Sequence, residues 1–315
     1  MTTPSVTPAS AAELDELNQQ FGRPGRIEFS LDPQGLVFVT LQFEQHQAGF
    51  YLQGAHLTSY RPAQCEEVLW VSSCAAFQPG KAIRGGIPLC WPWFGAHETL
   101  QDRPQHGFAR TGMFEVRGVE VGTGYTSIQC ALVQLPEFDE WLAQDKASCV
   151  VEMLVDIRLS TDLCLSVSSR NMAEIPVTVG AALHTYLRVG DVSKVAVPEL
   201  TELYYKDKLR GYEQRCQAQP LVVEEEVDRV YLVPPARVTL QDPLLQRDVH
   251  LHCSGNKDLV VWNPGPEKAL AMQDFDDQGY ANMLCLEPAL ALANVIELVP
   301  GEVHSLSMVL SVSAH

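Results

Sequence analysis

The chain has 315 residues, of which 46% are hydrophobic and 19% are charged. This composition excludes a disordered or collagen-like chain and is typical of a folded globular protein. The 22 Lys and Arg residues against 39 Asp and Glu residues give a net charge of −17, which argues against nucleic-acid binding because that function needs a basic surface.

The first predicted element is a short helix between Ser10 and Gly22. Ser10 and Glu13 have the spacing of a capping box, and Gly22 is typical of a residue that ends a helix. Three apolar residues share one face of this helix: Leu14, Leu17 and Phe21. We therefore expect residues 1–26 to form an N-terminal extension that contains this helix.

Beyond this helix, apolar residues recur with the period of two that is typical of β-strands, in short runs rich in β-branched and aromatic residues. These runs cover residues 36–43, 127–135, 149–159, 163–168, 177–182, 230–233, 249–252, 259–262 and 303–312. Turn-forming pairs such as Asp32-Pro33 and Gly255-Asn256 lie between many of them. One further segment, residues 136–145, has its apolar side chains at helical spacing.

The order of these elements predicts the fold class. Strands follow one another without the helices of about 10–15 residues that parallel sheets require, which indicates an all-β antiparallel sandwich or barrel. No Gly/Ser linker, long Pro-rich tract or repeat of fixed period divides the chain. We therefore expect a single large β domain over residues 27–315, with one or two minor helices.

Cysteine usage and the N-terminal sequence indicate a compartment. The nine cysteines are spread thinly, and no two form a Cys-x-x-Cys pair, so neither a disulfide framework nor a zinc site is expected. The first 22 residues contain no Lys or Arg and no apolar core of a signal peptide, and nowhere do 18 apolar residues follow one another. We expect a cytoplasmic protein that does not enter a membrane.

Several catalytic motifs are missing from the sequence. It contains no Gly-x-Ser-x-Gly elbow, no phosphate-binding Walker loop and no Gly-x-Gly-x-x-Gly fingerprint. His97-Glu98 begins like a zinc-protease motif, but Gln101 stands where the second histidine would be required. Metal and nucleotide chemistry are therefore not expected.

Two loop segments combine charged residues with glycine and aromatic residues. In residues 81–95, Arg84 is followed by two glycines, which we expect to let the backbone approach a ligand closely. Three aromatic residues follow that could form the flat walls of a binding site: Trp91, Trp93 and Phe94. The alternative is a surface loop whose aromatic rings cover the core. In residues 105–110, His106 and Arg110 bracket a turn and could face the same pocket, although a single histidine is more often structural.

Three further residues place a titratable group in a strand-like segment. His184 lies in an apolar segment and could be a core histidine bonded to the backbone. Glu287 lies within eleven residues that are otherwise apolar or proline, where burial would shift its pKa, unless an alternating strand turns it to solvent. Asp228 follows an acidic run, at the start of a strand pattern, and could point inward.

Six motifs occur in a characteristic order: KAIRGGIPLCWPWFG, QHGFAR, ALHTYL, DRVY, VVWNPG and CLEPALALAN. Together they resemble the glucose-6-phosphate 1-epimerase group, the hexose-6-phosphate mutarotases, within the aldose 1-epimerase superfamily. The resemblance extends from about Ile27 to Val312. It implies a galactose-mutarotase-like β-supersandwich and an enzyme without cofactor or metal that interconverts the α and β anomers of a hexose 6-phosphate.

The resemblance also implies roles for individual residues. His184 matches the catalytic histidine of the family, and Glu287 matches its catalytic glutamate. Four residues match substrate-binding positions, namely Arg84 and Arg110 at the phosphate and His106 and Asp228 along the sugar. The two arginines would also attract an anionic substrate against the net negative charge of the protein.

Anomerisation explains why an acid and a base are needed. The C1 hydroxyl loses a proton while the ring oxygen gains one, the ring opens to the aldehyde, and it closes again on the other face. We expect Glu287 to act as the base and His184 to act as the acid. A neighbouring carboxylate, either Glu287 or Asp228, would keep His184 protonated near neutral pH.

Three alternatives remain open on the sequence alone. The chain could be a mutarotase for unphosphorylated aldoses, a β-sandwich that binds carbohydrate or a protein without catalysis, or a structural β domain. The two arginines favour a phosphorylated substrate, because a neutral sugar does not need them. The acidic composition and the lack of coiled-coil heptads favour a monomer.

Overall fold

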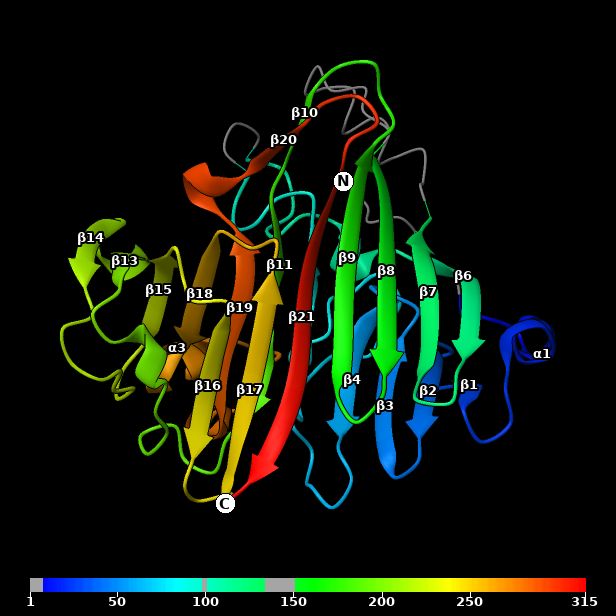
Figure 1. Cartoon of the computed structure of the whole chain (residues 1–315), viewed down its shortest axis with the longest axis horizontal. Helices are drawn as coiled ribbons and strands as arrows, with labels where there is room; N and C mark the ends of the chain where they lie inside the picture. Colours follow the sequence, from blue (N-terminus) through cyan, green and yellow to red (C-terminus); the bar gives the residue numbers. More distant parts are fainter. Residues whose placement is uncertain (1–7, 98–100, 134–150) are drawn as a thin grey trace.

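Antiparallel pairing joins the strands of this protein into three large sheets and one two-stranded ribbon (Figure 1). The computed structural model describes residues 8–97, 101–133 and 151–315. The predicted all-β fold is confirmed. The predicted helix over residues 136–145 lies outside the described residues.

The strands are distributed over the sheets as follows. The four-stranded sheet is a meander of β1 (Ile27–Leu31), β2 (Val37–Phe43), β3 (His46–Tyr51) and β4 (His56–Arg61). The seven-stranded sheet contains, in spatial order, β16 (Arg237–Asp242), β17 (Arg247–Ser254), β21 (Val303–Ala314), β9 (Leu163–Asn171), β8 (Val151–Leu159), β7 (Thr126–Leu132) and β6 (Phe114–Val121). The ribbon pairs β10 (Val177–Val179) with β20 (Ile296–Leu298).

The eight-stranded sheet is the one that carries most of the polar residues discussed above. Its spatial order is β14 (Glu213–Cys216), β13 (Tyr204–Asp207), β15 (Val227–Leu232), β18 (Asp258–Asn263), β19 (Met283–Leu290), β11 (Ala181–Leu183) and β5 (Leu89–Cys90), and β12 (Tyr186–Arg188) also pairs with β19. Strand β19 is buried along its whole length. Both of its faces are therefore covered by protein.

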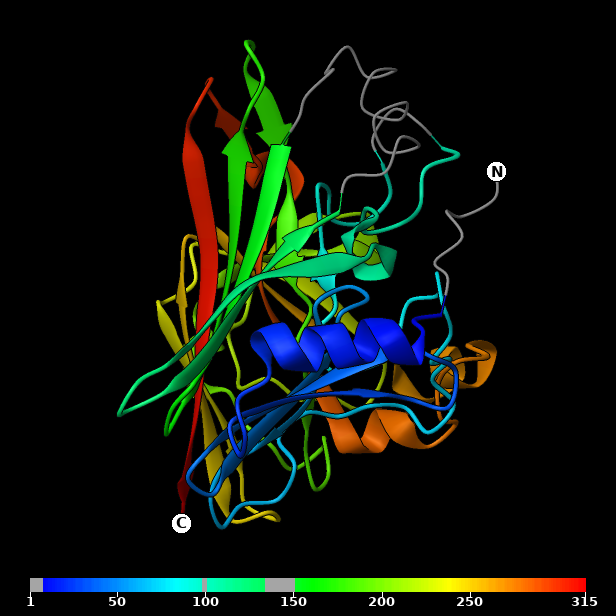
Figure 2. The ribbon, with the colours of Figure 1, turned by 90° about the vertical axis from the view of Figure 1, so that its right-hand side faces the viewer.

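The sheets form two layers (Figure 2). The four-stranded sheet contacts β7 and β8 of the seven-stranded sheet, and the eight-stranded sheet contacts β21 through β11 and β19. One continuous apolar core fills the space between the layers, from Leu41 of β2 to Leu286 of β19 and Leu306 of β21. Two smaller apolar clusters, around Trp262 and Val260, include side chains of the eight-stranded sheet that are not part of this core.

Few helices accompany the sheets in the described part of the chain. The predicted N-terminal helix is confirmed as α1 (Ala11–Phe21), with the Ser10–Glu13 capping box and Gly22 at its end. Its apolar residues pack against the main core. A second helix, α3 (Gly265–Ala271), was not predicted. The short 3₁₀ turns are η1 (Ala109–Thr111), η2 (Pro198–Leu200), η3 (Lys208–Arg210), η4 (Gly279–Asn282) and η5 (Leu292–Asn294).

All nine predicted strand runs fall on strands over their described residues, with shifted ends. The run 177–182 is two strands, because the chain leaves β10 at Gly180 and enters a different sheet as β11. No helix in the described residues has the length and apolar character needed to cross a bilayer. The cysteines among them are all free thiols, and Cys74 and Cys216 are exposed. The expected division of the chain before Ile27 stays a prediction.

Candidate active site

Strand register brings two titratable side chains together in the eight-stranded sheet. In β12, Tyr186 pairs with Cys285 of β19, and β11 pairs with the same strand in the same register. His184 lies two positions before Tyr186, and Glu287 lies two positions after Cys285. The shared register therefore places His184 opposite Glu287. Between β11 and β12 the pairing with β19 is interrupted, next to Pro288, which has no N–H to donate to a ladder. Two residues that are about a hundred positions apart in sequence are therefore neighbours.

The His184–Glu287 pair is buried and unusual in its hydrogen bonding. Glu287 has 0% exposure, and its Oε1 lies 3.3 Å from Nδ1 of His184, whose side chain is 11% exposed. Neither carboxylate oxygen has a hydrogen-bond partner among the described residues. A buried polar atom without a partner costs about 1–3 kcal/mol, and native proteins keep few of them. The alternative that Glu287 faces solvent is wrong, and a functional use of the carboxyl group is indicated.

Burial sets the protonation of the pair. It raises the pKa of Glu287 well above its usual range, with the negative charge of Asp228 acting in the same direction. It lowers the pKa of His184 well below 6.5, and the neighbouring His106, Arg84 and Arg110 add to this shift. Burial therefore favours the neutral form of each group over the expected imidazolium–carboxylate pair.

Aromatic rings surround His184. The ring of Tyr186 stacks on the imidazole with centroids 4.8 Å apart, and the Trp262 indole meets it edge-on at 5.9 Å. Phe94 lies against His106 at 4.9 Å. Trp91, by contrast, is buried in the main core and donates its indole N–H to Ser169. Trp91 therefore belongs to the core and is not a wall of the candidate site.

Arg84 is connected to the pair through Tyr186. Its guanidinium donates to the Tyr186 hydroxyl at 3.1 Å and forms an ion pair with Asp274, also at 3.1 Å. Burial alone would lower the pKa of Arg84, but Tyr186 and Asp274 together raise it above its usual value. The Arg84 charge is therefore fixed in place by the same ring that stacks on His184.

His106 contacts the ring of His184, and Arg110 acts on His184 electrostatically. The His106 ring meets that of His184 edge-on at 5.7 Å, and its Nδ1 accepts a hydrogen bond from the Gly95 N–H. Burial and the Arg110 charge lower the pKa of His106 to about 3, so that it is neutral and carries its proton on Nε2. Arg110 itself donates to the Gln105 carbonyl from η1.

Asp228 of β15 completes the predicted set. Its carboxylate is buried and pairs with Lys208 of η3 at 2.8 Å, although burial still raises the pKa of Asp228. Asp228 raises and Lys208 lowers the pKa of Glu287. The four predicted substrate-binding residues thus each contact the His184–Glu287 pair or act on it electrostatically.

Four residues near the pair were not assigned roles from the sequence. They are Tyr186, Lys208, Trp262 and Cys285. Cys285 lies in the same apolar motif as Glu287 and looks like a core residue, yet its Sγ lies 3.7 Å from His184 Nδ1. Lys208 had one sequence signal, because it belongs to the basic run 206–210 in an acidic chain.

The two glycines after Arg84 have a different purpose from the one expected. Gly85 and Gly86 have φ of +113° and +65°, and a Cβ on Gly86 would lie 2.1 Å from the Leu57 carbonyl oxygen. A Cβ on Gly85 would lie 2.4 Å from Val71 Cα. The glycines let two segments of the protein backbone pack together beside Arg84. The expectation that they let the backbone approach a ligand is not supported.

We predict that Gly86→Ala lowers the free energy of unfolding by about 2–4 kcal/mol, from the combined cost of the positive φ and of the backbone overlap. Gly25→Ala is the matched control, because Gly25 also has φ of +68° but no atom within 4 Å of its Cβ position. It should lose only about 1–2 kcal/mol. Urea denaturation measures both values, and equal losses would contradict the close approach to Leu57.

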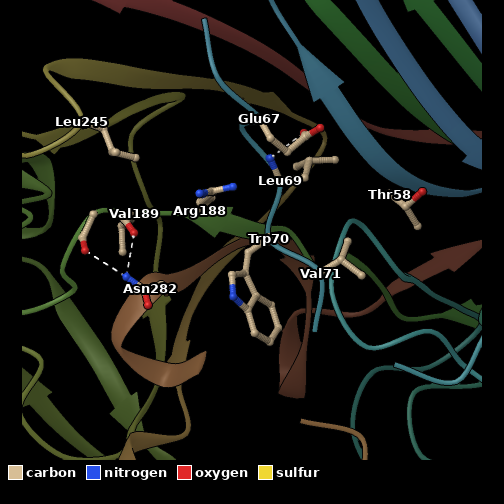
Figure 3. A pocket seen from close by; sticks show the side chains of 10 residues that line it. Thr58, Glu67, Leu69, Trp70, Val71, Arg188, Val189, Leu245 and Asn282 are labelled. Carbon is tan, nitrogen blue, oxygen red and sulfur yellow. Dashed lines mark hydrogen bonds between the residues drawn. The ribbon is translucent and has the colours of Figure 1, made fainter. Parts of the chain in front are cut away.

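A separate cavity of about 550 Å³ lies nearby but does not contain the pair (Figure 3). Trp70, which also stacks on Tyr186 at 5.8 Å, is one of its walls. The cavity is also lined by the carboxylate of Glu67, which already accepts hydrogen bonds from Ser59 and from backbone N–H groups. None of the six predicted site residues lines this cavity. The geometry of the His184–Glu287 pair, not cavity volume, therefore identifies the candidate site.

The chain is similar to a characterised family over most of its length. The family model described as aldose 1-epimerase matches residues 38–311. A protein of Cenchrus ciliaris named "Putative glucose-6-phosphate 1-epimerase" is 38% identical over 276 residues, which cover 86% of this chain and 83% of that protein. A protein of Escherichia coli with the same name is 34% identical, with 81% and 84% covered.

Solved structures show the same similarity. The crystal structure of a "putative mutarotase (YeaD)" from Salmonella typhimurium has a TM-score of 0.85 and 25% identity, and the match covers 96% of this chain and 100% of that one. A galactose 1-epimerase from Lactobacillus acidophilus shares the fold alone, with a TM-score of 0.70, 11% identity, and 92% and 99% covered.

Proposed function

The chain belongs to the aldose 1-epimerase family, and from this membership and the site geometry we propose that it interconverts the α and β anomers of a hexose 6-phosphate, with glucose 6-phosphate as the best candidate. That the protein is an epimerase with hexose mutarotase activity follows from the family. The specific substrate and the roles of the residues are our proposal. The observation that carries it is the unpartnered, buried carboxyl group of Glu287 at 3.3 Å from His184.

The pair contains the one mobile proton that anomerisation needs. A carboxylic acid beside a neutral imidazole has as many protons as a carboxylate beside an imidazolium. Transfer of one proton between Oε1 and Nδ1, which lie 3.3 Å apart, would convert one form to the other. In the second form, the Glu287 carboxylate accepts the C1 hydroxyl proton while the His184 imidazolium donates a proton to the ring oxygen.

This transfer opens the ring and regenerates the neutral pair. The open-chain aldehyde is then accompanied by the carboxylic acid and the neutral imidazole, which are the forms that burial favours at this site. Rotation about the C1–C2 bond and reversal of both proton transfers close the ring on the other face. Neutral His106, with its proton on Nε2, would donate a hydrogen bond to the sugar.

The positive groups around the pair support a phosphorylated substrate. Arg84 and Arg110 both lie near enough to His184 to lower its pKa, and Lys208 acts on Glu287. A phosphate monoester suits guanidinium groups because they bind its oxygens through paired, charge-assisted hydrogen bonds. The relatives from Cenchrus ciliaris and Escherichia coli are named for a phosphorylated hexose as well.

One observation favours a second candidate, a mutarotase for unphosphorylated aldoses. Arg84 already has an anionic partner, since Asp274 pairs with it at 3.1 Å. A neutral sugar would leave that ion pair intact, whereas a phosphate would compete with Asp274 for the guanidinium. The side chain of Asp274 is 37% exposed, and such a partly exposed ion pair contributes little stability, so that a dianion can displace it.

We predict that Arg84→Ala raises the KM for glucose 6-phosphate by about 10–100-fold, the loss of roughly 1.5–3 kcal/mol for hydrogen bonds to a charged group. The KM for glucose should change by less than about threefold, since that sugar has no phosphate to bind. Arg117→Ala, at an arginine of β6 whose side chain is 53% exposed, is the matched control and should change neither KM. Equal effects of Arg84→Ala on both sugars would favour the neutral-sugar candidate.

A further inference from the structure

We propose that His184, Cys285 and Glu287 form a binding site for a thiophilic divalent cation, with Zn²⁺ as the ion whose ligand preferences they match. Occupation of this site would inhibit the enzyme, because the cation would bind to both members of the acid–base pair. The inhibitory consequence rests on the proposed function, whereas cation binding itself does not.

The positions of the donor atoms carry the proposal. The Nδ1 of His184 lies 3.7 Å from the Cys285 Sγ and 3.3 Å from the Glu287 Oε1, and all three donor atoms lie within 4.8 Å of one another. Tetrahedral zinc, with bonds of about 2.0–2.3 Å, places its nitrogen, sulfur and oxygen ligands about 3.3–3.6 Å apart. The two separations that involve the imidazole therefore already match zinc geometry. A small movement of Cys285 or Glu287 would complete the site.

A second observation points to a ligand at the same place. The Glu287 carboxyl group is completely buried and lacks a hydrogen-bond partner on both oxygens within the described part of the chain. A cation bound at this point would give one or both oxygens the partner that the protein does not supply. Among the described residues, no other group of three such donors has this spacing.

The fold holds the three donors in place. Cys285 and Glu287 are two residues apart on β19 and therefore point to the same face of the sheet. His184 lies between β11 and β12, which both pair with β19, and is in register with Glu287. Its ring is held by stacking on Tyr186. Three protein ligands with a fourth position open is the arrangement of zinc sites that exchange a water or another small ligand.

The local charges determine which cation can bind. Arg84, Arg110 and Lys208 oppose any cation. Binding releases the protons of the Cys285 thiol and the Glu287 carboxyl group, and the resulting thiolate and carboxylate balance the charge of a divalent ion. Hard cations such as Mg²⁺ need several oxygen ligands, which this site does not offer. The site should therefore discriminate strongly in favour of ions that bind sulfur and nitrogen.

Co²⁺ is the direct probe, because it replaces zinc and gives a near-ultraviolet charge-transfer band only when a thiolate is bound. The experiment uses the full chain with Cys74→Ser and Cys216→Ser, which remove the two thiols that are exposed in the described part of the chain. We expect a thiolate band that saturates at one Co²⁺ per chain and that Zn²⁺ abolishes. Adding Cys285→Ser should remove the band. A band that persists without Cys285, or no band in the parent protein, would overturn the proposal.

His184→Gln provides a second test that does not depend on Cys285. It keeps the thiol, so the band should persist while the Co²⁺ affinity falls at least about tenfold, since even outer-shell partners of a metal contribute 10–100-fold. An unchanged affinity would contradict the assignment of His184 as a ligand. Circular dichroism checks that each variant is folded.

Inhibition is measured separately from binding. Zn²⁺ should slow anomer exchange in the Cys74→Ser/Cys216→Ser protein, and the concentration required should rise at least about tenfold when Cys285→Ser is added, each variant being compared with its own rate in chelator. Mg²⁺ should have no effect. If the chain accelerated no anomer exchange, the proposed function would fail, but the Co²⁺ band would still decide the metal site. Binding without inhibition would show that the cation does not occupy the acid–base pair.

Discussion

Glu287→Gln should lower kcat for the exchange of hexose 6-phosphate anomers by about 10²–10⁴-fold, the usual contribution of one general acid or base. An amide of nearly the same size cannot accept the C1 hydroxyl proton. Since the Glu287 oxygens have no hydrogen-bond partners among the described residues, the substitution removes no bond that stabilises the fold. The thermal midpoint should therefore stay close to that of the unmodified protein.

The control for this prediction is Glu297→Gln in β20, where the side chain is exposed. It makes the same chemical change away from the pair and should leave kcat unchanged. A folded Glu287→Gln protein with the unmodified rate would show that Glu287 is not the base.

We predict a second large effect for His184→Ala, which should also lower kcat by about 10²–10⁴-fold. The substitution removes the imidazole that lies 3.3 Å from Glu287 and that we propose exchanges a proton with it. The ring also packs on Tyr186, so some loss of stability is expected in addition. Initial rates at saturating substrate, with circular dichroism on the same samples, separate the two effects.

His252→Ala is the matched control for this change, because His252 is an exposed histidine of β17. It should retain the rate of the unmodified protein. Retention of that rate by His184→Ala would remove the histidine from the mechanism and leave the glutamate to be explained in another way.

The sequence predicted the strand-rich fold because its strands have clear local signals. The alternation in residues 36–43 reappears as β2, and the capping box at Ser10 reappears at the start of α1. Many other strands lie outside the nine predicted runs, among them β1, β6, β13, β14 and β16. The residues of β14 are exposed throughout, so no apolar face marks them in the sequence. The helix α3 was missed because it has only seven residues, too few for a clear helical period.

The residues of the candidate site could be predicted from the sequence, but their protonation states could not. A lone glutamate in an apolar segment signals burial, and Glu287 is indeed buried. Its protonation depends on neighbours that only the fold brings together, such as Asp228 and Lys208 from other elements. The same holds for Cys285, whose thiol faces His184 only because β12 pairs with β19 in one particular register. Long-range register of this kind has no local sequence signal.

Anomer exchange at equilibrium tests the central claim most directly. The two anomeric proton resonances of glucose 6-phosphate are followed by exchange NMR, with the unmodified protein and with Glu287→Gln at equal concentration. We expect exchange cross-peaks with the unmodified protein and only the uncatalysed exchange with Glu287→Gln. Uncatalysed exchange with the unmodified protein, or equal acceleration by both, would contradict the assignment of the His184–Glu287 pair to hexose 6-phosphate anomerisation.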